Sequence, residues 1–244
     1  MKPIVLENAP NHIIVKMSNK PVILPTEIRN QHNLYWEEQI KNNPTLHNGD
    51  SFAITEIEHT PEKLVITVTK TDYKHYLYTL RHADCAYPCQ VLYTCAAVIT
   101  NDQHIVIGRM NPLTSTPDRL QFTGGGLEES DFDGEKFTLE KNISTEIKEE
   151  MGLDIYSSSV ISFHPKFIKH KGSHDFWAVI YEITVDYTVQ GLHTLFLSHN
   201  QQLIERGERP EFADLLFLPL EKEAIQTFIK NEKSPMVDYL VRFF

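Results

Sequence analysis

The sequence is short of glycine, cysteine and long hydrophobic stretches. It has ten glycines and three cysteines among 244 residues. No apolar stretch approaches the roughly 20 residues that a membrane-spanning helix needs, and the first residues lack the charged and apolar regions of a signal peptide. We therefore expect a soluble, cytoplasmic protein that has no membrane partner.

Positive charge is also scarce. Lysine and arginine together number 23 against 33 aspartates and glutamates, which gives a formal net charge of -10. Binding to a nucleic-acid backbone draws most of its affinity from a basic surface, so this balance argues against a nucleic-acid partner. A small phosphorylated ligand remains compatible with an acidic protein, because a bound metal and a few local cations can neutralise it.

The three cysteines, Cys85, Cys89 and Cys95, are odd in number and close together in the sequence. This pattern favours reduced thiols over a disulfide framework. Cys85 and Cys89 could form part of a zinc site with His82. Because no fourth ligand follows at a usual spacing, ordinary buried or loop thiols are the simpler interpretation.

The chain shows no repeat, and its patterns change near Pro88. We predict an N-terminal α+β extension over residues 1–88 and a main domain over residues 89–244. In the extension the strands are expected at residues 3–6, 13–17, 51–58 and 63–69, and the helices after N-caps at Thr26 and Asp72. The tyrosines after Asp72 are expected to pack on the strands, with ligand stacking as the alternative.

After Pro88 a strand-rich pattern alternates with helical segments. Strands are expected at residues 91–100, 105–110, 160–168, 175–185 and 215–218, and helices at 194–206, 220–230 and 235–243. A further helix is expected to carry Leu139, Ile143, Ile147 and Met151 at steps of four and to stop at Gly152. Helices can then cover both faces of a mixed sheet. The predicted fold class is α/β, with a three-layer α/β/α sandwich as the architecture.

The segment from Thr123 to Asp154 reads TGGGLEESDFDGEKFTLEKNISTEIKEEMGLD and begins with three consecutive glycines, Gly124 to Gly126, out of ten in the chain. Glu146, Glu149 and Glu150 are spaced i, i+3, i+4, so on a helix they share one face. Like charges this close repel each other, which indicates a divalent cation that offsets the repulsion; a solvated acidic face is the plainer alternative. The preceding glycines allow the backbone to approach a ligand or ion without a Cβ in the way.

This arrangement resembles the Nudix hydrolase signature, GX5EX7REUXEEXGU, in which U is aliphatic. The second half matches from Glu146 to Leu153. The first half departs from it, because Thr145 stands where the family has arginine, and Gly125 and Thr145 are 20 positions apart against 14 in the pattern. Glu135 is the best candidate for the first glutamate. In the family this glutamate pairs with the arginine as a structural brace. Loss of the arginine therefore removes the brace and leaves the metal-binding carboxylates in place.

A wider resemblance extends over most of the chain. The segments DYKHYLYTLRH, IVIGRMNP and FTGGGLEE, together with the long insertion, are similar to the Nudix subfamily that hydrolyses UDP-glucose and UDP-galactose. The resemblance implies a Nudix-type fold and a magnesium-dependent or manganese-dependent enzyme. The implied reaction is hydrolysis of a nucleotide sugar to a nucleoside monophosphate and a sugar 1-phosphate.

The resemblance also implies roles for individual residues. Glu146, Glu149 and Glu150 would bind the metal together with the backbone carbonyl of Gly125 or Gly126. The general base would be Glu146 or Glu211, and Glu211 as an ordinary surface charge is the alternative. Phosphate or sugar would be bound by cations chosen from Arg109, Lys166, Lys169 and Lys171, each of which is otherwise a solvated charge.

Several alternatives stay open. The substrate could be ADP-ribose or a dinucleoside polyphosphate, and the chain could also be a catalytically inactive Nudix-like binding or regulatory module. Isomerase chemistry, which occurs in a distant Nudix branch, has no specific support. The base and sugar preference, the number of metal ions and the oligomeric state are left undetermined.

Overall fold

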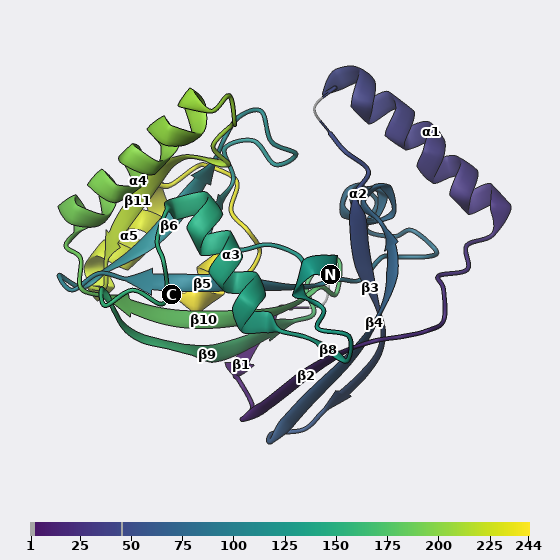
Figure 1. Cartoon of the computed structure of the whole chain (residues 1–244), viewed down its shortest axis with the longest axis horizontal. Coiled ribbons are helices and arrows are strands. Elements are labelled where there is room, and N and C mark those ends of the chain that lie inside the picture. Colours follow the sequence, from purple (N-terminus) through teal and green to yellow (C-terminus); the bar gives the residue numbers. More distant parts are fainter. Residues whose placement is uncertain (1–2, 45) are drawn as a thin grey trace. The chain divides into compact units, whose positions relative to one another are not determined.

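The computed structural model describes residues 3–44 and 46–244 (Figure 1). Its residues group into two compact units, neither of which is continuous in the sequence. Unit 1 contains Met1–Tyr93, Gly126–Asn142 and Lys169–Ala178, and unit 2 contains Thr94–Gly125, Ile143–Ile168 and Val179–Phe244. The predicted domain boundary at residue 88 stays a prediction. The two compact units are each built from several separate segments of the chain.

Unit 1 is formed mainly by a four-stranded sheet and two helices. Its main elements are β1 (Val5–Asn8), β2 (His12–Met17), α1 (Thr26–Asn42), β3 (Asp50–His59), β4 (Lys63–Asp72), α2 (Tyr73–Arg81) and β8 (Lys136–Phe137). The sheet has the order β3-β4-β2-β8, in which β2 and β4 are parallel and the other pairs antiparallel. This sheet therefore combines parallel and antiparallel pairs.

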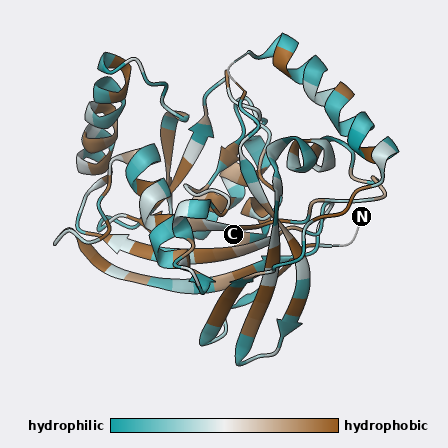
Figure 2. Ribbon diagram, turned by 45° about the vertical axis from the view of Figure 1, so that its right-hand side comes forward, coloured by the Kyte–Doolittle hydropathy of each residue, from teal (hydrophilic) through white to brown (hydrophobic). Residues whose placement is uncertain are grey.

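The two helices of unit 1 begin differently. Asp72 caps α2 as predicted, because its carboxylate accepts a hydrogen bond from the backbone N–H of His75 at 3.2 Å. The prediction for α1 is wrong in detail, since Thr26 lies inside the helix and Pro25 occupies the cap position without a side-chain hydrogen bond. Proline has a φ suited to a helix start, and α1, which is largely hydrophilic in Figure 2, has one buried residue, His32.

Unit 2 contains the carboxylate helix. Its elements are β5 (Leu92–Ile99), β6 (His104–Met110), β7 (Leu120–Gln121), α3 (Leu139–Met151), β9 (Val160–His170), β10 (Trp177–Val185), α4 (Val189–Glu205), β11 (Phe212–Pro219), α5 (Lys222–Asn231) and α6 (Leu240–Phe243). Some of these elements have ends in unit 1. The larger sheet has seven strands in the order β1-β9-β10-β5-β6-β11, with β7 paired to β6. Mixed sheets accompanied by helices confirm the α/β class.

The core of unit 2 follows the strand pattern. Ile105 and Ile107 in β6 and Ile180 and Ile183 in β10 are fully buried. These strands read as nearly continuous apolar runs, which is typical of strands that are covered on both faces. Figure 2 shows the same concentration of hydrophobic residues along the strands.

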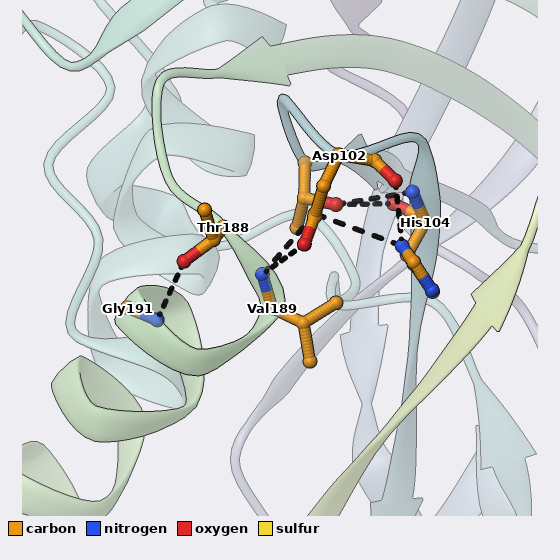
Figure 3. Close-up of polar contacts among 6 residues, drawn as sticks. Asp102, His104, Thr188, Val189 and Gly191 are labelled. Atoms are coloured by element: carbon orange, nitrogen blue, oxygen red, sulfur yellow. Dashed lines mark hydrogen bonds and ion pairs between the residues drawn. The ribbon is translucent and has the colours of Figure 1, made fainter.

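The hairpin between β5 and β6 is linked to the start of α4 (Figure 3). Asp102 in its turn accepts hydrogen bonds from the backbone N–H of Val189, 3.2 Å from each carboxylate oxygen. The hydroxyl of Thr188 accepts from the N–H of Gly191 and caps the helix. The helix therefore begins earlier than the predicted residue 194, because these two side chains satisfy the backbone donors of its first turn.

The C-terminal helix is shorter than predicted. The sequence predicts a helix that includes residues 235–239, but Met236 forms a parallel bridge to Leu120, and α6 begins at Leu240. The N–H of Leu120 donates to Pro235, and the N–H of Val237 donates to Leu120. This segment therefore satisfies its backbone groups by pairing next to β7 instead of within a helix.

Candidate active site

Helix α3 is anchored by a buried stripe of apolar side chains, and its glutamates border this stripe. Leu139, Ile143, Ile147 and Met151 are exposed by 8% or less. Their spacing of four residues places them on one face, as the sequence predicts. The helix ends at Gly152, which has a φ of +71° and would bring a Cβ to 2.7 Å from Cβ of His199.

The glycine turn runs beside β5. The N–H of Ala96 donates to Thr123 at 2.8 Å, and the N–H of Thr94 donates to Gly125 at 3.0 Å. Gly124 has a φ of +143°, and a Cβ there would lie 2.5 Å from Cα of Cys95. Glycine is thus required at 124 both by its conformation and by the proximity of the neighbouring strand.

Gly125 makes room for Glu146. A Cβ at position 125 would lie 2.5 Å from Cδ of Glu146, whereas a Cβ at Gly126 would meet no atom within 4 Å. The carboxylate of Glu146 therefore lies directly against the backbone of the turn. The Gly125 carbonyl already accepts the Thr94 hydrogen bond, which leaves it one further lone pair for a cation.

Glu150 is the buried member of the carboxylate cluster, with 3% exposure. Its Oε2 accepts hydrogen bonds from the Thr123 hydroxyl at 2.5 Å and from the Gly124 N–H at 2.8 Å. Its Oε1 is buried and has no hydrogen-bond partner. Burial, followed by the charges of Glu211 and Glu146, raises the pKa of Glu150 well above its usual range.

Glu211 joins this cluster from a distant part of the chain. It precedes β11, and its backbone carbonyl accepts a hydrogen bond from the Asn111 N–H at 2.7 Å. Burial raises the pKa of the Glu211 carboxyl above its usual value. The positive charge of Arg119 lowers this pKa, and the negative charge of Glu149 raises it. The residue as a whole keeps contact with solvent. Glu150, which is almost completely enclosed, is therefore the carboxylate most strongly affected by burial.

The donors of the cluster suit a hard divalent cation. Carboxylate oxygens and one backbone carbonyl are the ligands that Mg²⁺ and Mn²⁺ prefer, and the unpartnered Oε1 of Glu150 is the buried acceptor that such an ion would satisfy. Among the described residues, no three of these carboxylates have ligand atoms all within 4.8 Å of one another. Mutual repulsion keeps negative groups apart, so a cation would also draw them closer.

Three of the cations predicted to bind substrate contact other groups of the protein. Arg109 donates to the Ser234 hydroxyl at 2.6 Å, and its guanidinium lies 3.7 Å from Glu232. Lys166 forms an ion pair with Glu182 at 3.1 Å. In unit 1 the buried Lys169 donates to the Phe176 carbonyl at 3.1 Å, and Lys171 has a φ of +64°. Contact between any of these residues and substrate stays a prediction.

Sequence reasoning missed two residues next to the glutamates. The hydroxyl of Thr123 donates a hydrogen bond to the Glu150 carboxylate. The charge of Arg119 lowers the pKa of Glu211, and its guanidinium donates to the Gln121 side chain at 3.0 Å. Both flank the glycine turn in the sequence, which was the available signal. Glu135, the candidate first glutamate, is exposed and belongs to unit 1, and its role stays a prediction.

The three cysteines are thiols that take no part in disulfides. Cys89 is fully buried, and burial raises its pKa to about 12. Among the described residues, His82, Cys85 and Cys89 do not form a group with ligand atoms within 4.8 Å of one another. The interpretation of these cysteines as ordinary thiols is the one that this geometry favours.

Comparison with known proteins finds similar folds at low identity. No protein-family model matches the sequence, and no curated protein matches it significantly. A Deinococcus radiodurans protein of known structure is 18% identical, with a TM-score of 0.42 over 63% of this chain and 80% of its own.

Two further similar structures are described in connection with ADP ribose. The NUDIX domain of Shewanella oneidensis NrtR, solved with ADP ribose, is 12% identical with a TM-score of 0.39 over 68% of this chain and 92% of its own. A Francisella tularensis bifunctional NMN adenylyltransferase/ADP ribose pyrophosphatase, solved with AMP and a Mn ion, is 13% identical with a TM-score of 0.40 over 68% of this chain and 43% of its own.

Within the described residues, no helix combines the length and the apolar character needed to cross a membrane.

Proposed function

We propose that this protein is a metal-dependent hydrolase of the Nudix type that cleaves the diphosphate linkage of a nucleoside diphosphate joined to another group. The observation that carries the proposal is the environment of Glu150. A buried carboxylate with two donors on one oxygen and none on the other, close to the charges of Glu146 and Glu211, is costly unless a cation compensates it.

The three glutamates of α3 are the proposed metal ligands. Glu146, Glu149 and Glu150 would hold Mg²⁺ or Mn²⁺, and the Gly125 carbonyl would supply a further oxygen ligand. Such an ion, when bound, screens the diphosphate charge and lowers the pKa of water. Thr123 and the Gly124 N–H orient Glu150 through its Oε2, which leaves Oε1 as the ligand atom.

The proton of the attacking water is taken by Glu211 or Glu146. Glu211 is favoured because its raised pKa makes it a stronger base than an ordinary carboxylate, and because its residue is open to solvent. The positive charge of Arg119 opposes the upward shift of the Glu211 pKa. Glu146, pressed against Gly125, is the alternative base.

The substrate is most simply a UDP-sugar, hydrolysed to UMP and a sugar 1-phosphate. This choice rests on the resemblance of the tyrosine-rich helix, the β6 segment and the glycine turn to the UDP-glucose and UDP-galactose group. ADP-ribose is the main competitor. Purified protein with Mg²⁺ should be incubated with UDP-glucose, UDP-galactose, ADP-ribose and dinucleoside polyphosphates. Turnover of ADP-ribose without turnover of UDP-sugars would reject the substrate choice and leave the hydrolase proposal intact.

The metal assignment is tested by Glu149→Gln and Glu150→Gln. Both should lower kcat/KM by about 100-fold or more, because removal of an anionic ligand weakens the ion that stabilises transition-state charge. The matched control is Glu140→Gln, the same substitution on an exposed residue in the first turn of α3. Equal activity in all three variants would refute the proposed metal site.

A noncatalytic binding module is the second candidate, because the signature lacks its arginine. In that case a nucleotide would bind in the presence of Mg²⁺, as measured by calorimetry, without any product forming. The hydrolase proposal fails if the wild-type protein binds UDP-glucose or ADP-ribose but releases no nucleoside monophosphate.

A further inference from the structure

A second group of metal-ligand side chains lies within unit 1. It consists of Glu7 in β1, His59 at the end of β3 and His170 at the end of β9. Glu7 Oε1 lies 2.8 Å from Nε2 of His170 and 3.6 Å from Nε2 of His59. One ligand atom from each residue falls within 4.8 Å of the others, and no other group of three or more has this property among the described residues.

These separations fit coordination to one ion. Ligands placed 2.0–2.1 Å from a tetrahedral zinc ion lie about 3.4 Å from one another. The 3.6 Å separation of Glu7 and His59 is close to that value, and the 2.8 Å contact with His170 is a hydrogen bond that must lengthen by about 0.6 Å. Side-chain adjustments of this size are small.

The histidine rings are already constrained by packing. His170 stacks on Trp177 with ring centroids 4.7 Å apart and an interplanar angle of 19°. His59 meets the edge of the same indole at 5.5 Å and 88°, and the two histidine rings are 5.8 Å apart and nearly perpendicular. Trp177 therefore orders both imidazoles before any ion arrives, which reduces the entropy lost on binding.

We propose that Glu7, His59 and His170 bind a zinc ion. Two imidazole nitrogens and one carboxylate oxygen are a ligand set that favours zinc and similar transition metals over magnesium. The side chains of Glu7, His59 and His170 are 39%, 23% and 14% exposed. Water can therefore reach the site and supply a fourth ligand.

The role of this ion is to tie together strands that are distant in the sequence. β3 belongs to the four-stranded sheet, whereas β1 and β9 are neighbours in the seven-stranded sheet. A three-ligand ion would hold the N-terminal strand β1 to the ends of β3 and β9. Because the unfolded chain does not keep these residues together, zinc binding should stabilise the fold.

The test uses Trp177 as a reporter in the full-length Trp36→Phe variant, which removes the other tryptophan. Metal-free protein is titrated with Co²⁺ and then with Zn²⁺, in millimolar Mg²⁺ that fills the carboxylate site. We expect saturable quenching of Trp177 fluorescence by one equivalent of Co²⁺, visible absorption bands of nitrogen-coordinated Co²⁺, and reversal of both by Zn²⁺. Zn²⁺ should also raise the Tm by several degrees.

His59→Gln and His170→Gln should each weaken binding at least tenfold, whereas His12→Gln, an exposed histidine in β2, should leave it unchanged. Equal binding in all three variants, or loss of binding in Glu149→Gln instead, would overturn the proposal. Should a variant fail to fold, anomalous scattering at the zinc edge from wild-type crystals decides the matter, since zinc must appear between these three side chains. Zinc only at the α3 carboxylates, or none, refutes the site.

Discussion

At the scale of single residues, the candidate active site depends on a close approach between backbone and carboxylate. Gly125 and Gly126 are adjacent and chemically identical, yet only Gly125 faces Glu146. The space around the turn thus admits a Cβ at position 126 and not at position 125. This contrast supplies a test in which the two substitutions are the same.

Gly125→Ala is expected to lower kcat/KM at least tenfold, because its Cβ would lie 2.5 Å from Cδ of Glu146 and force that carboxylate to move. Gly126→Ala should stay within about twofold of wild type, since its Cβ meets nothing within 4 Å. Steady-state hydrolysis at saturating Mg²⁺ measures both. Similar losses in the two variants would mean that the placement of Glu146 does not matter.

At the scale of elements, α1 is attached to α2 through histidine and tyrosine rings. His32 is the buried residue of α1, and its ring lies 4.4 Å from Tyr78 and 5.1 Å from His75. Burial, and then the nearby His75, lower the pKa of His32 to about 4. A histidine that stays neutral in the fold makes the packing of this helix dependent on pH.

The sign of this dependence follows from proton binding. Between pH 6.5 and about 4 the unfolded chain holds a proton on His32 that the folded protein does not, so acid favours unfolding. The contribution is fully present above pH 6.5 and is lost as the pH falls toward 4. We expect His32 to account for a loss on the order of 1–3 kcal/mol over this window.

The measurement is urea denaturation at several pH values for wild type, His32→Gln and the exposed control His12→Gln. His32→Gln should show a shallower fall in the free energy of unfolding between pH 6.5 and 4, and the control should follow wild type. A His32→Gln profile parallel to wild type would show that His32 titrates normally in the folded protein.

At the scale of the whole molecule, the two units carry ligand sets of different chemistry. Unit 2 contains the oxygen-only cluster of α3 and Glu211, and unit 1 contains the Glu7, His59 and His170 group. Hard cations prefer the first set and zinc prefers the second. The same chain should therefore respond to the two kinds of ion in different segments.

Hydrogen exchange read by mass spectrometry should separate these responses. Mn²⁺ should slow exchange in peptides covering α3 and the glycine turn, and Zn²⁺ should slow exchange in β1 and the end of β3. Glu149→Gln should remove only the Mn²⁺ effect and His59→Gln only the Zn²⁺ effect. Protection of the same peptides by both ions would contradict the assignment of two separate sites.

Much of the candidate active site was predictable because its signals are local. The stripe from Leu139 to Met151, the i, i+3, i+4 glutamates and the stop at Gly152 are periodic features that a helix displays by its own geometry. The observed α3 contains the predicted stripe and ends before Gly152 as expected, and Asp72 caps α2 as predicted. Backbone bridges were harder, since nothing local signals the pairing of Met236 with Leu120 that shortens α6.

The sequence by itself determined the α/β class, the carboxylate face and the acidic charge, because composition and short-range periodicity specify them. Only the tertiary structure decided that Glu150 is buried with one unpartnered oxygen, that Glu211 joins it, and that Glu7 meets His59 and His170. These meetings depend on strand order and on packing between segments far apart in the chain. The spacing of residues along the sequence does not predict contacts between such distant segments.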